Sequence, residues 1–451
     1  MTHCNNPSIS FSSFDGRKVL AKFDGGTITS DAGALLLRQA DQQIQLIEQL
    51  DQCIPDPRNQ QHTIHSQRSM LAQRIFGIAL AYEDLNDHQT LRNDLLWQTL
   101  CERANRNKTP MASAPTLCRL ENRNTLTREV LVDMSTVFVE TFIKSHDAPP
   151  KELVLDFDAT DDLIHGHQEK RFFHGYYRNN CYLPLYVFCG NKLLVAYLRP
   201  SNIDAAKHSW AILALLVKRF RQAWPGVKIV FRGDSGFCRW KMLRWCDKHD
   251  VGYLVGIAKN PVLMREADKW VQHAKQQFQA SKQKQRIFGE FTYKAKSWDC
   301  PRKIVVKAEH LEKGPNTRFI LTNLSDATQL LYDEQYCARG EMENRIKEQQ
   351  LYLFADRTSC SAFLANQFRL LLSSAAYVLV EHIRQVGLME TELANATVET
   401  IRLKLFKIGA QICQSVRRIV LHFSSSYPYQ KLFGCVLERL GPVRFGWPCF
   451  Q

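Results

Sequence analysis

KELVLDFDAT, residues 151–160, is the stretch that decides the fold class of this chain. Leucine and phenylalanine side chains at positions 153, 155 and 157 alternate with the side chains at 154, 156 and 158. A period of two residues predicts a β-strand with one apolar face. Asp156 and Asp158 share the other face, near the end of the strand.

Strand and helix patterns alternate along the next hundred residues. Gly190-Asn191 is a hairpin signal between two apolar runs. The expected elements are strands at 181–189, 192–198, 228–232 and 253–257 and helices at 205–221 and 239–249. The order of three strands, helix, strand, helix and strand predicts an α/β fold. We expect a mixed sheet with helices packed on it, as in ribonuclease-H-like folds.

The regions on either side have a different composition. Helical periodicity dominates up to residue 145, with expected helices at 32–50, 66–82, 93–106 and 128–145, and residues 146–150 read as a linker. Residues 259–307 hold 12 Lys and Arg against 4 Asp and Glu, which indicates a basic insertion. Further helices are expected at 332–353 and 361–386, before a basic C-terminal region.

The overall charge narrows the class of partner. The chain has 59 basic and 45 acidic side chains, a net charge of +14, and such a surface attracts polyanions, nucleic acid first. Its 14 cysteines form no C-x-x-C pair, so no zinc ribbon is predicted, and we expect reduced thiols in a cytoplasmic protein. The apolar run at 370–380 is shorter than the roughly 18 residues of a membrane span.

Three carboxylates stand where a metal site could form. Asp158 ends the first strand, Asp234 follows the strand at 228–232, and Glu343 lies on the helix at 332–353. Carboxylates at one edge of a sheet raise each other's pKa unless cations hold them, and Mg²⁺ prefers such oxygen ligands. A strand-end Asp is often only a turn former, and Asp156, on the same face as Asp158, competes for the first position.

The helix at 332–353 carries a polar stripe. The stripe steps by three and four residues through Tyr336, Arg339, Glu343, Lys347 and Gln350. This spacing puts all five side chains on one face. The face is either a solvated, salt-bridged surface or a site where Glu343 binds metal while Arg339 and Lys347 hold phosphates.

These residues resemble a known family. Tyr336, Arg339 and Glu343 match the Tyr-Arg-Glu-Lys signature of transposases related to insertion sequence 4, and Asp158-Ala159-Thr160 and Gly233-Asp234-Ser235-Gly236-Phe237 resemble the two Asp motifs of that group. Five further segments resemble the insertion sequence 1380 family: Phe23-Asp24-Gly25-Gly26, Leu183-Pro184-Leu185-Tyr186, Arg199-Pro200-Ser201-Asn202, Met342-Glu343-Asn344-Arg345-Ile346-Lys347-Glu348 and Ala355-Asp356-Arg357-Thr358-Ser359. The signature Lys would fall at Gln350, and Lys347 is the expected substitute.

The resemblance implies a DNA transposase of the DDE type. Asp158, Asp234 and Glu343 would be catalytic and would hold two Mg²⁺ ions, for which Mn²⁺ can substitute, while Tyr336, Arg339 and Lys347 would contact DNA. Such enzymes cut the ends of an insertion sequence and join them to target DNA, in this group through a hairpin intermediate. Trp298 is a candidate for stacking on a flipped base, with ordinary packing as the alternative.

The resemblance also implies a division into parts. The expected parts are a helical DNA-end-binding region (1–148), a ribonuclease-H-like catalytic domain in two pieces (149–258 and 331–390), a basic β-rich insertion (259–330) and a basic C-terminal region (391–451). The implied partners are the double-stranded terminal inverted repeats, target DNA and a second copy of the chain, with no membrane, in the bacterial cytoplasm at the nucleoid. A metal-dependent nuclease without strand joining and an inactive DNA-binding relative are the alternatives.

Three smaller groups of residues also fit contact with DNA. His165, His167 and His174 lie between the first two strands, as a metal site or as a loop near DNA. The same loop holds Lys170, Arg171 and Arg178, and the C-terminal region holds Arg402, Lys404, Lys407, Arg417 and Arg418. Both basic groups could bind phosphate or simply be solvated. The expected helix at 93–106 is a weak candidate for a helix-turn-helix reader.

Overall fold

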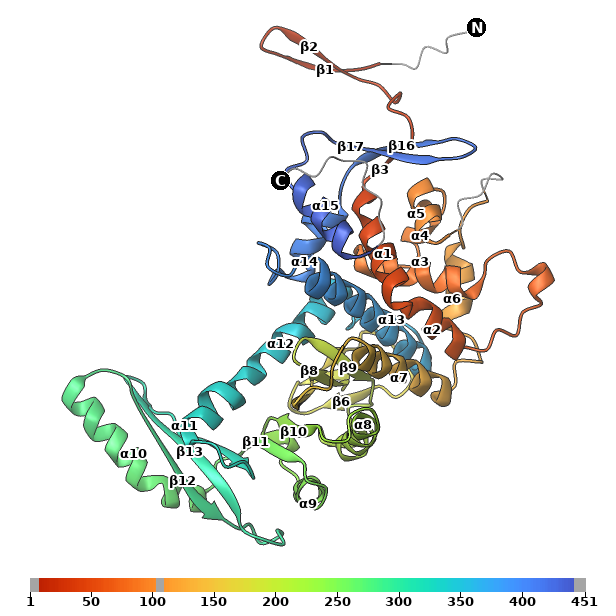
Figure 1. Cartoon of the computed structure of the whole chain (residues 1–451). Helices are drawn as coiled ribbons and strands as arrows, with labels where there is room; N and C mark the ends of the chain where they lie inside the picture. Colours follow the sequence, from red (N-terminus) through yellow and green to blue (C-terminus); the bar gives the residue numbers. More distant parts are fainter. Residues whose placement is uncertain (1–7, 103–108, 442–451) are drawn as a thin grey trace, which may run out of the picture. The chain divides into compact units, whose positions relative to one another are not determined.

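The computed structural model describes residues 8–102 and 109–441, and its chain forms two compact units (Figure 1). One unit combines Met1–Thr125 with Ala375–Gln451, and the other is Leu126–Ser374. The second unit contains all three carboxylates that the sequence singles out. It is described first.

A nine-stranded mixed sheet forms the frame of the unit Leu126–Ser374, as the sequence predicts. Its order is β12-β13-β15-β11-β10-β4-β8-β9, with β14 paired to β13. The central strands β4 (Glu152–Ala159), β10 (Lys228–Gly233) and β11 (Gly252–Ile257) run parallel to one another. The flanking strands pair antiparallel: β8 (Leu185–Cys189), β9 (Lys192–Tyr197), β12 (Gln285–Tyr293), β13 (Arg302–Leu311), β14 (Gly314–Pro315) and β15 (Arg318–Thr322).

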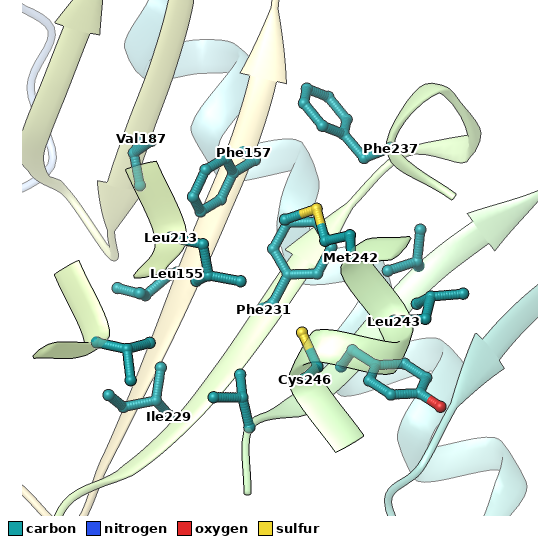
Figure 2. Packing of buried hydrophobic residues seen from close by; sticks show 14 of the residues in the cluster. Leu155, Phe157, Val187, Leu213, Ile229, Phe231, Phe237, Met242, Leu243 and Cys246 are labelled. Carbon is teal, nitrogen blue, oxygen red and sulfur yellow. The ribbon is translucent and has the colours of Figure 1, made fainter. Parts of the chain in front are cut away.

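The two faces of this sheet bury different residues because side chains alternate along a strand. Leu155 and Phe157 of β4 pack with Phe231 of β10 and with the helices α8 (Ser209–Ala223) and α9 (Trp240–Lys248) (Figure 2). The helix α7 (Arg128–Lys144) adds Phe142 to the same core. This apolar layer leaves the Asp156 and Asp158 side of β4 for the other face.

A second, smaller core covers that other face. It joins Val230 of β10 and Leu254 of β11 to Leu331 and Tyr332. The last two belong to a helical run from Thr328 to Tyr352, made of α11 (Thr328–Leu330), η4 (Leu331–Tyr336), η5 (Cys337–Arg339), α12 (Gly340–Lys347) and η6 (Glu348–Tyr352). The expected helix at 332–353 is therefore present, and its packing brings Glu343 to the face that carries Asp158.

The basic segment at 259–330 contains a helix that the sequence analysis missed. Its helix α10 (Pro261–Ser281) begins at Asn260, whose side chain accepts a hydrogen bond from the Leu263 amide, with Pro261 in the first turn. These are start signals that could have been recognised. The strands of the segment do not form a sheet of their own, because β15 pairs directly with β11.

The expected strand at 181–189 is wrong as a single element. Pro184 lacks an amide donor, and the chain leaves one sheet and enters another at this point. The residues before it form β7 (Asn179–Tyr182), which pairs with β5 (Asp162–Leu163) and β6 (Phe172–His174) in a small separate sheet. Those after it form β8 of the main sheet.

The other unit is mostly helical, with strands that the sequence analysis did not predict. Its helices are η1 (Ala32–Ala34), α1 (Leu35–Ile44), α2 (Leu46–Cys53), η2 (Gln60–His62), α3 (Gln67–Ala79), α4 (Asp87–Leu91), α5 (Leu95–Leu100), α6 (Ala114–Glu121), α14 (Val398–Ile401), η8 (Arg402–Phe406) and α15 (Gln430–Arg439). A hairpin is formed by β1 (Ile9–Phe14) and β2 (Arg17–Ala21), and β3 (Ile28–Thr29) pairs with the hairpin of β16 (Ala410–Gln414) and β17 (Ile419–Phe423). Of the expected helix at 93–106, residues 103–106 lie outside the described residues.

One helical segment has the length and apolarity of a membrane span. It runs over Phe363–Gly387 and comprises α13 (Phe363–His382) and η7 (Ile383–Gly387). Most of it, 83% of its most apolar window, is buried inside the structure. Burial of this kind is also what a core helix of a globular protein shows.

The first unit closes on itself through a close approach of two backbones. A Cβ atom on Gly33 would lie 1.7 Å from the carbonyl oxygen of Leu405, which leaves no room for any side chain at this position. The amide of Ala32 donates to the carbonyl of Ile408, 3.0 Å away. Glycine therefore lets the start of the helical region pack against a segment near the other end of the chain.

We predict that Gly33→Ala lowers the free energy of unfolding by about 1–3 kcal/mol, because a methyl group there overpacks against backbone. Gly409→Ala is the matched control, since a Cβ at Gly409 meets no atom within 4 Å. Urea unfolding of both variants measures the difference. Equal stability of the two variants would contradict the close approach.

Candidate active site

The pairing of β4 with β10 brings Asp158 and Asp234 next to each other. In the parallel ladder Gly233 is opposite Phe157, so the residue after each of these two is an aspartate. Neighbouring strands lie about 4.8 Å apart. Asp234 begins the turn after β10, and its Oδ1 accepts a hydrogen bond of 2.8 Å from the Gly236 amide.

A buried ion pair fixes the helical run to this edge of the sheet. Arg232 and Asp156 are opposite each other on β10 and β4, and the Arg232 Nη2 lies 2.7 Å from the Asp156 Oδ2. The same guanidinium donates through Nη1 to the carbonyl oxygen of Gln335, one residue before Tyr336. Burial raises the pKa of Asp156, and the hydrogen bonds and charge of Arg232 oppose this shift. Asp156, the alternative first carboxylate, is thus engaged in holding the fold.

Arg339 joins the first and third carboxylates. Its Nη1 lies 3.3 Å from the Asp158 Oδ2, and its Nη2 lies 2.9 Å from the Glu343 Oε1. Asp158 and Arg339 are largely buried, at 17% and 16% side-chain exposure, whereas Glu343 is 47% exposed. A carboxylate on β4 and one on α12, which the sequence separates widely, therefore share one guanidinium.

The charge of the second carboxylate, Asp234, acts on the first carboxylate, Asp158. The pKa of Asp158 is raised to about 6, mainly by burial, and the charges of Asp234 and Glu343 raise it further. The Arg339 charge and a hydrogen bond from the Ala159 amide lower it. Asp158 therefore feels both other acids, as carboxylates in a common site do.

Tyr336 approaches the same edge from the helical run. A Cβ on Gly256 of β11 would lie 2.6 Å from the Tyr336 hydroxyl and 2.9 Å from the Ser235 amide nitrogen, so both atoms lie over this glycine. Burial raises the pKa of Tyr336, and the charge of Asp234 contributes to the rise. Tyr336, predicted from the signature, thus lies beside the second carboxylate.

The carboxylates Asp158 and Glu343 are paired with Arg339 in the structure. In the part of the chain that the structure describes, no three His, Cys, Asp or Glu side chains are close enough together to form a ready metal site. The space between Asp158 and Glu343 is instead taken by the Arg339 guanidinium, so a cation already balances these acids. Carboxylate oxygens at one sheet edge are the ligands that Mg²⁺ prefers.

Gln350 and Lys347 have different surroundings. The Gln350 Nε2 donates to the Asp162 Oδ1 over 3.0 Å and to the Asp161 carbonyl over 3.2 Å, so this residue ties the helical run to the loop after β4. Lys347 is exposed on α12. Phosphate binding by Lys347 in place of the signature Lys stays a prediction.

Trp298 lies in the main core rather than on the surface. Its side chain is 8% exposed and packs edge-on against Tyr293, with ring centroids 5.4 Å apart, while the Arg302 guanidinium lies over the ring at 5.5 Å. In this structure Trp298 is a packing residue. Stacking on a flipped base would require the side chain to leave the core.

The expectation of one basic DNA-binding face at the C-terminus is wrong for two of its members. Arg402 is 6% exposed and donates through Nε to the Ala79 carbonyl over 2.8 Å. Lys407 forms an ion pair of 2.8 Å with Asp31 and lies 3.9 Å from the centre of the Tyr82 ring. Both side chains hold the helical unit together, which sequence alone could not distinguish from surface charge.

The histidines at 165, 167 and 174 form no three-ligand metal site with other described residues. His174 instead belongs to a hairpin, where its ring lies 4.9 Å from that of Tyr177. The sequence analysis missed Arg232, which links β10, β4 and the Glu343 helix. Its signal was a basic residue that directly follows the apolar run Ile229–Phe231, two residues before Asp234.

Comparison with known proteins gives one family match over nearly the whole chain. A family model described as "Transposase DDE domain group 1" matches residues 11–445. A comparison with curated proteins found no match. Among solved structures, the cryo-EM structure of the piggyBac transposase synaptic complex with hairpin DNA is similar at a TM-score of 0.41 and 9% identity, over 93% of this chain and 87% of that one.

We predict that Asp156→Asn lowers the free energy of unfolding by about 3 kcal/mol, because it leaves the Arg232 guanidinium buried without its counter-charge. Asp158→Asn is the matched control. The raised pKa of Asp158 means that its ionised form is disfavoured in the folded protein, so the neutral amide should cost no stability at pH 7.5. Urea unfolding at that pH compares the two variants. A similar loss in both would refute the separate roles.

Proposed function

The chain belongs to the DDE transposases, enzymes that cut and join DNA, and we propose that Asp158, Asp234 and Glu343 are its catalytic carboxylates. The observation that carries this proposal is the single guanidinium of Arg339, which lies against both Asp158 and Glu343. The charge of Asp234 acts on the same Asp158 carboxylate. The proposal therefore rests on one ion-pair bridge between two acids and on the electrostatic effect of the third, although repulsion between them opposes the arrangement.

The three carboxylates would hold two Mg²⁺ ions, for which Mn²⁺ can substitute. Such ions activate the attacking water or 3′-hydroxyl and stabilise the leaving oxygen during phosphoryl transfer. The protein supplies the oxygen ligands on two parallel strands and a helix, held in place by the Arg232–Asp156 pair.

Arg339 has two successive partners in this proposal. In the structure it neutralises Asp158 and Glu343. With metal held by the carboxylates, the Arg339 guanidinium would be free to bind a phosphate of the DNA, a partner that its planar fork suits well. Tyr336 positions the DNA strand beside Asp234. Lys347 is exposed on the same helical run and adds a second phosphate contact.

The finer assignment follows the sequence motifs. We place the chain in the insertion sequence 1380 family, with a ribonuclease-H-like catalytic domain. Its substrates are then the terminal inverted repeats of an insertion sequence and target DNA, joined by cut-and-paste transposition in the bacterial cytoplasm. Two ends must be held together for this reaction, so a homodimer in the synapse is the simplest assembly.

A nuclease that cuts without joining is the second candidate, since the same carboxylates would serve it. The two functions differ in one product. Incubation of the purified protein with a labelled element end, Mg²⁺ and a supercoiled plasmid yields end-to-plasmid joints for a transposase and only nicked ends for a nuclease. Joints that appear with the wild type and are absent without Mg²⁺ support the proposal.

We predict that Asp158→Asn, Asp234→Asn and Glu343→Gln each reduce nicking of the element end by at least about a hundredfold, because each removes a charged metal ligand. DNA binding, measured in a gel-shift assay without Mg²⁺, should remain. Glu341→Gln is the control, since Glu341 is an exposed acid on the same helix. Nicking at the wild-type rate by any of the three variants would remove that residue from the site.

We also predict a pH dependence set by Asp158. Its pKa of about 6 lies above the usual value, so the carboxylate takes up a proton as the pH falls through 6 and ceases to be a metal ligand. At limiting Mg²⁺ the nicking rate should therefore rise with pH through about 6. The midpoint should move to lower pH as Mg²⁺ increases, because metal competes with the proton. A midpoint independent of Mg²⁺ would contradict this assignment.

A further inference from the structure

A small sheet extends directly from the end of the strand that carries Asp158. After Ala159, the last residue of β4, the chain enters β5 at Asp162, which pairs with Tyr182 of β7. The third strand, β6, pairs with β7 to form a hairpin over residues 172–182, here called the aromatic hairpin. Asp158 of β4 is opposite Tyr186 of β8, and Asp162 of β5 is opposite Tyr182 of β7, so the base of the aromatic hairpin lies next to the first carboxylate.

The aromatic hairpin exposes rings that a globular protein normally buries. Tyr176 is 83% exposed and Phe173 is 63% exposed. The rings of Tyr176 and Tyr177 are nearly perpendicular, with centroids 5.0 Å apart. Exposed aromatic surface of this kind marks an interaction site.

The charge of the segment selects the class of partner. The aromatic hairpin contains Arg178 and no acidic residue, and Lys170 and Arg171 directly precede it, after Glu169. Arg178, in the turn, and Arg171 are exposed, whereas Lys170 lies 4.5 Å from the centre of the Phe363 ring. Basic side chains interleaved with exposed aromatic rings are typical of surfaces that bind nucleic-acid strands.

The hairpin stands on a firm base. The carbonyl of Phe172 accepts a hydrogen bond of 2.9 Å from the Ser201 hydroxyl, and the Tyr182 hydroxyl donates to the Glu169 carbonyl over 2.6 Å. The Glu169 carboxylate in turn accepts from the Phe363 amide over 2.9 Å. A rigid hairpin loses little entropy on binding, so it can hold a ligand in one place relative to Asp158.

We propose that the aromatic hairpin holds the DNA strand next to the cleaved bond: the ring of Tyr176 stacks on an unpaired base there, and Arg178 neutralises a neighbouring phosphate. This inference rests on the proposed function, because it places the cleaved bond at Asp158. It moves the stacking role from the buried Trp298 to a ring that is already exposed. The ligand is a nucleotide of a locally opened duplex, recognised by its π-face rather than by sequence.

The test pairs a protein change with a DNA change. The wild type, Tyr176→Ala and Tyr176→Trp are each assayed on duplexes that carry the element's terminal inverted repeat, either intact or with one abasic site. The abasic site is moved in turn through the nucleotides flanking the cleaved bond. Equilibrium binding in EDTA and nicking in Mg²⁺ are both measured. Trp210→Ala is the matched control, since Trp210 is an aromatic residue of the same unit with 51% exposure.

On the intact end, Tyr176→Ala should weaken binding about fivefold or more, the effect of one stacked base, while Tyr176→Trp and Trp210→Ala bind like the wild type. At one abasic position the wild type and Tyr176→Ala should become equal, because the partner of the ring is gone. Arg178→Gln should weaken all duplexes alike and reduce the salt dependence of binding. The substituted side chains are exposed, so these variants should fold like the wild type. Thermal melting of each variant checks that its melting temperature is unchanged.

Two results separate the inference from the proposed function. If the wild type nicks the end and Tyr176→Ala binds and nicks equally well, the hairpin does not hold the strand, although the enzyme is a transposase. Losses from Tyr176→Ala that are the same at every abasic position also overturn the stacking. If the wild type does not nick in Mg²⁺, the proposed function fails, and the placement of the strand at Asp158 fails with it.

Discussion

The buried ion pair between Arg232 and Asp156 is the interaction on which the arrangement of the site depends. It crosses from β10, which Asp234 follows, to β4, which carries Asp158, and the same guanidinium reaches the backbone at Gln335. Arg232 thus links the two strands to each other and to the helical run that carries Glu343. A buried ion pair adds little net stability, because desolvation offsets the attraction. Here the ion pair fixes the positions of β10, β4 and the helical run.

Charge balance is the second constraint. Three carboxylates at one sheet edge repel one another, and burial of Asp158 adds to the cost of its ionisation. Arg339 meets that cost within the protein itself, since it contacts two of the three acids. A folded protein that has not yet bound metal is therefore not forced to protonate the group fully. The same residue that keeps the carboxylates assembled also keeps them from forming an open metal site.

Much of this could be predicted from the sequence because local patterns control it. The alternation in β4, the Asp after β10 and the three-and-four spacing on the Glu343 helix depend on neighbouring residues, and the structure contains all three. The role of Arg232, the burial of Trp298 and the use of Lys407 as a core cation depend on residues far away in the chain. A charge count treats Arg402 and Lys407 as surface, and only tertiary contacts show that they are not.

The aromatic hairpin and α10 were missed for different reasons. For α10 the start signals were present, but the prediction for this segment rested on its basic charge rather than on its helical periodicity. In the hairpin, strands of two to four residues carry too little periodicity for a pattern to be read. Its exposed rings are recognisable as a surface feature only once the fold shows that nothing covers them.

The joining of β15 to β11 has a mechanical consequence. Because β12, β13 and β15 continue the ladder that holds β10 and β4, the basic segment cannot swing as a separate lobe on a flexible tether. A displacement of β12, β13 or β15 passes through backbone hydrogen bonds, one strand at a time, to β10 and the turn that carries Asp234. The basic segment and the strand that leads to the second carboxylate are thereby parts of one continuous sheet.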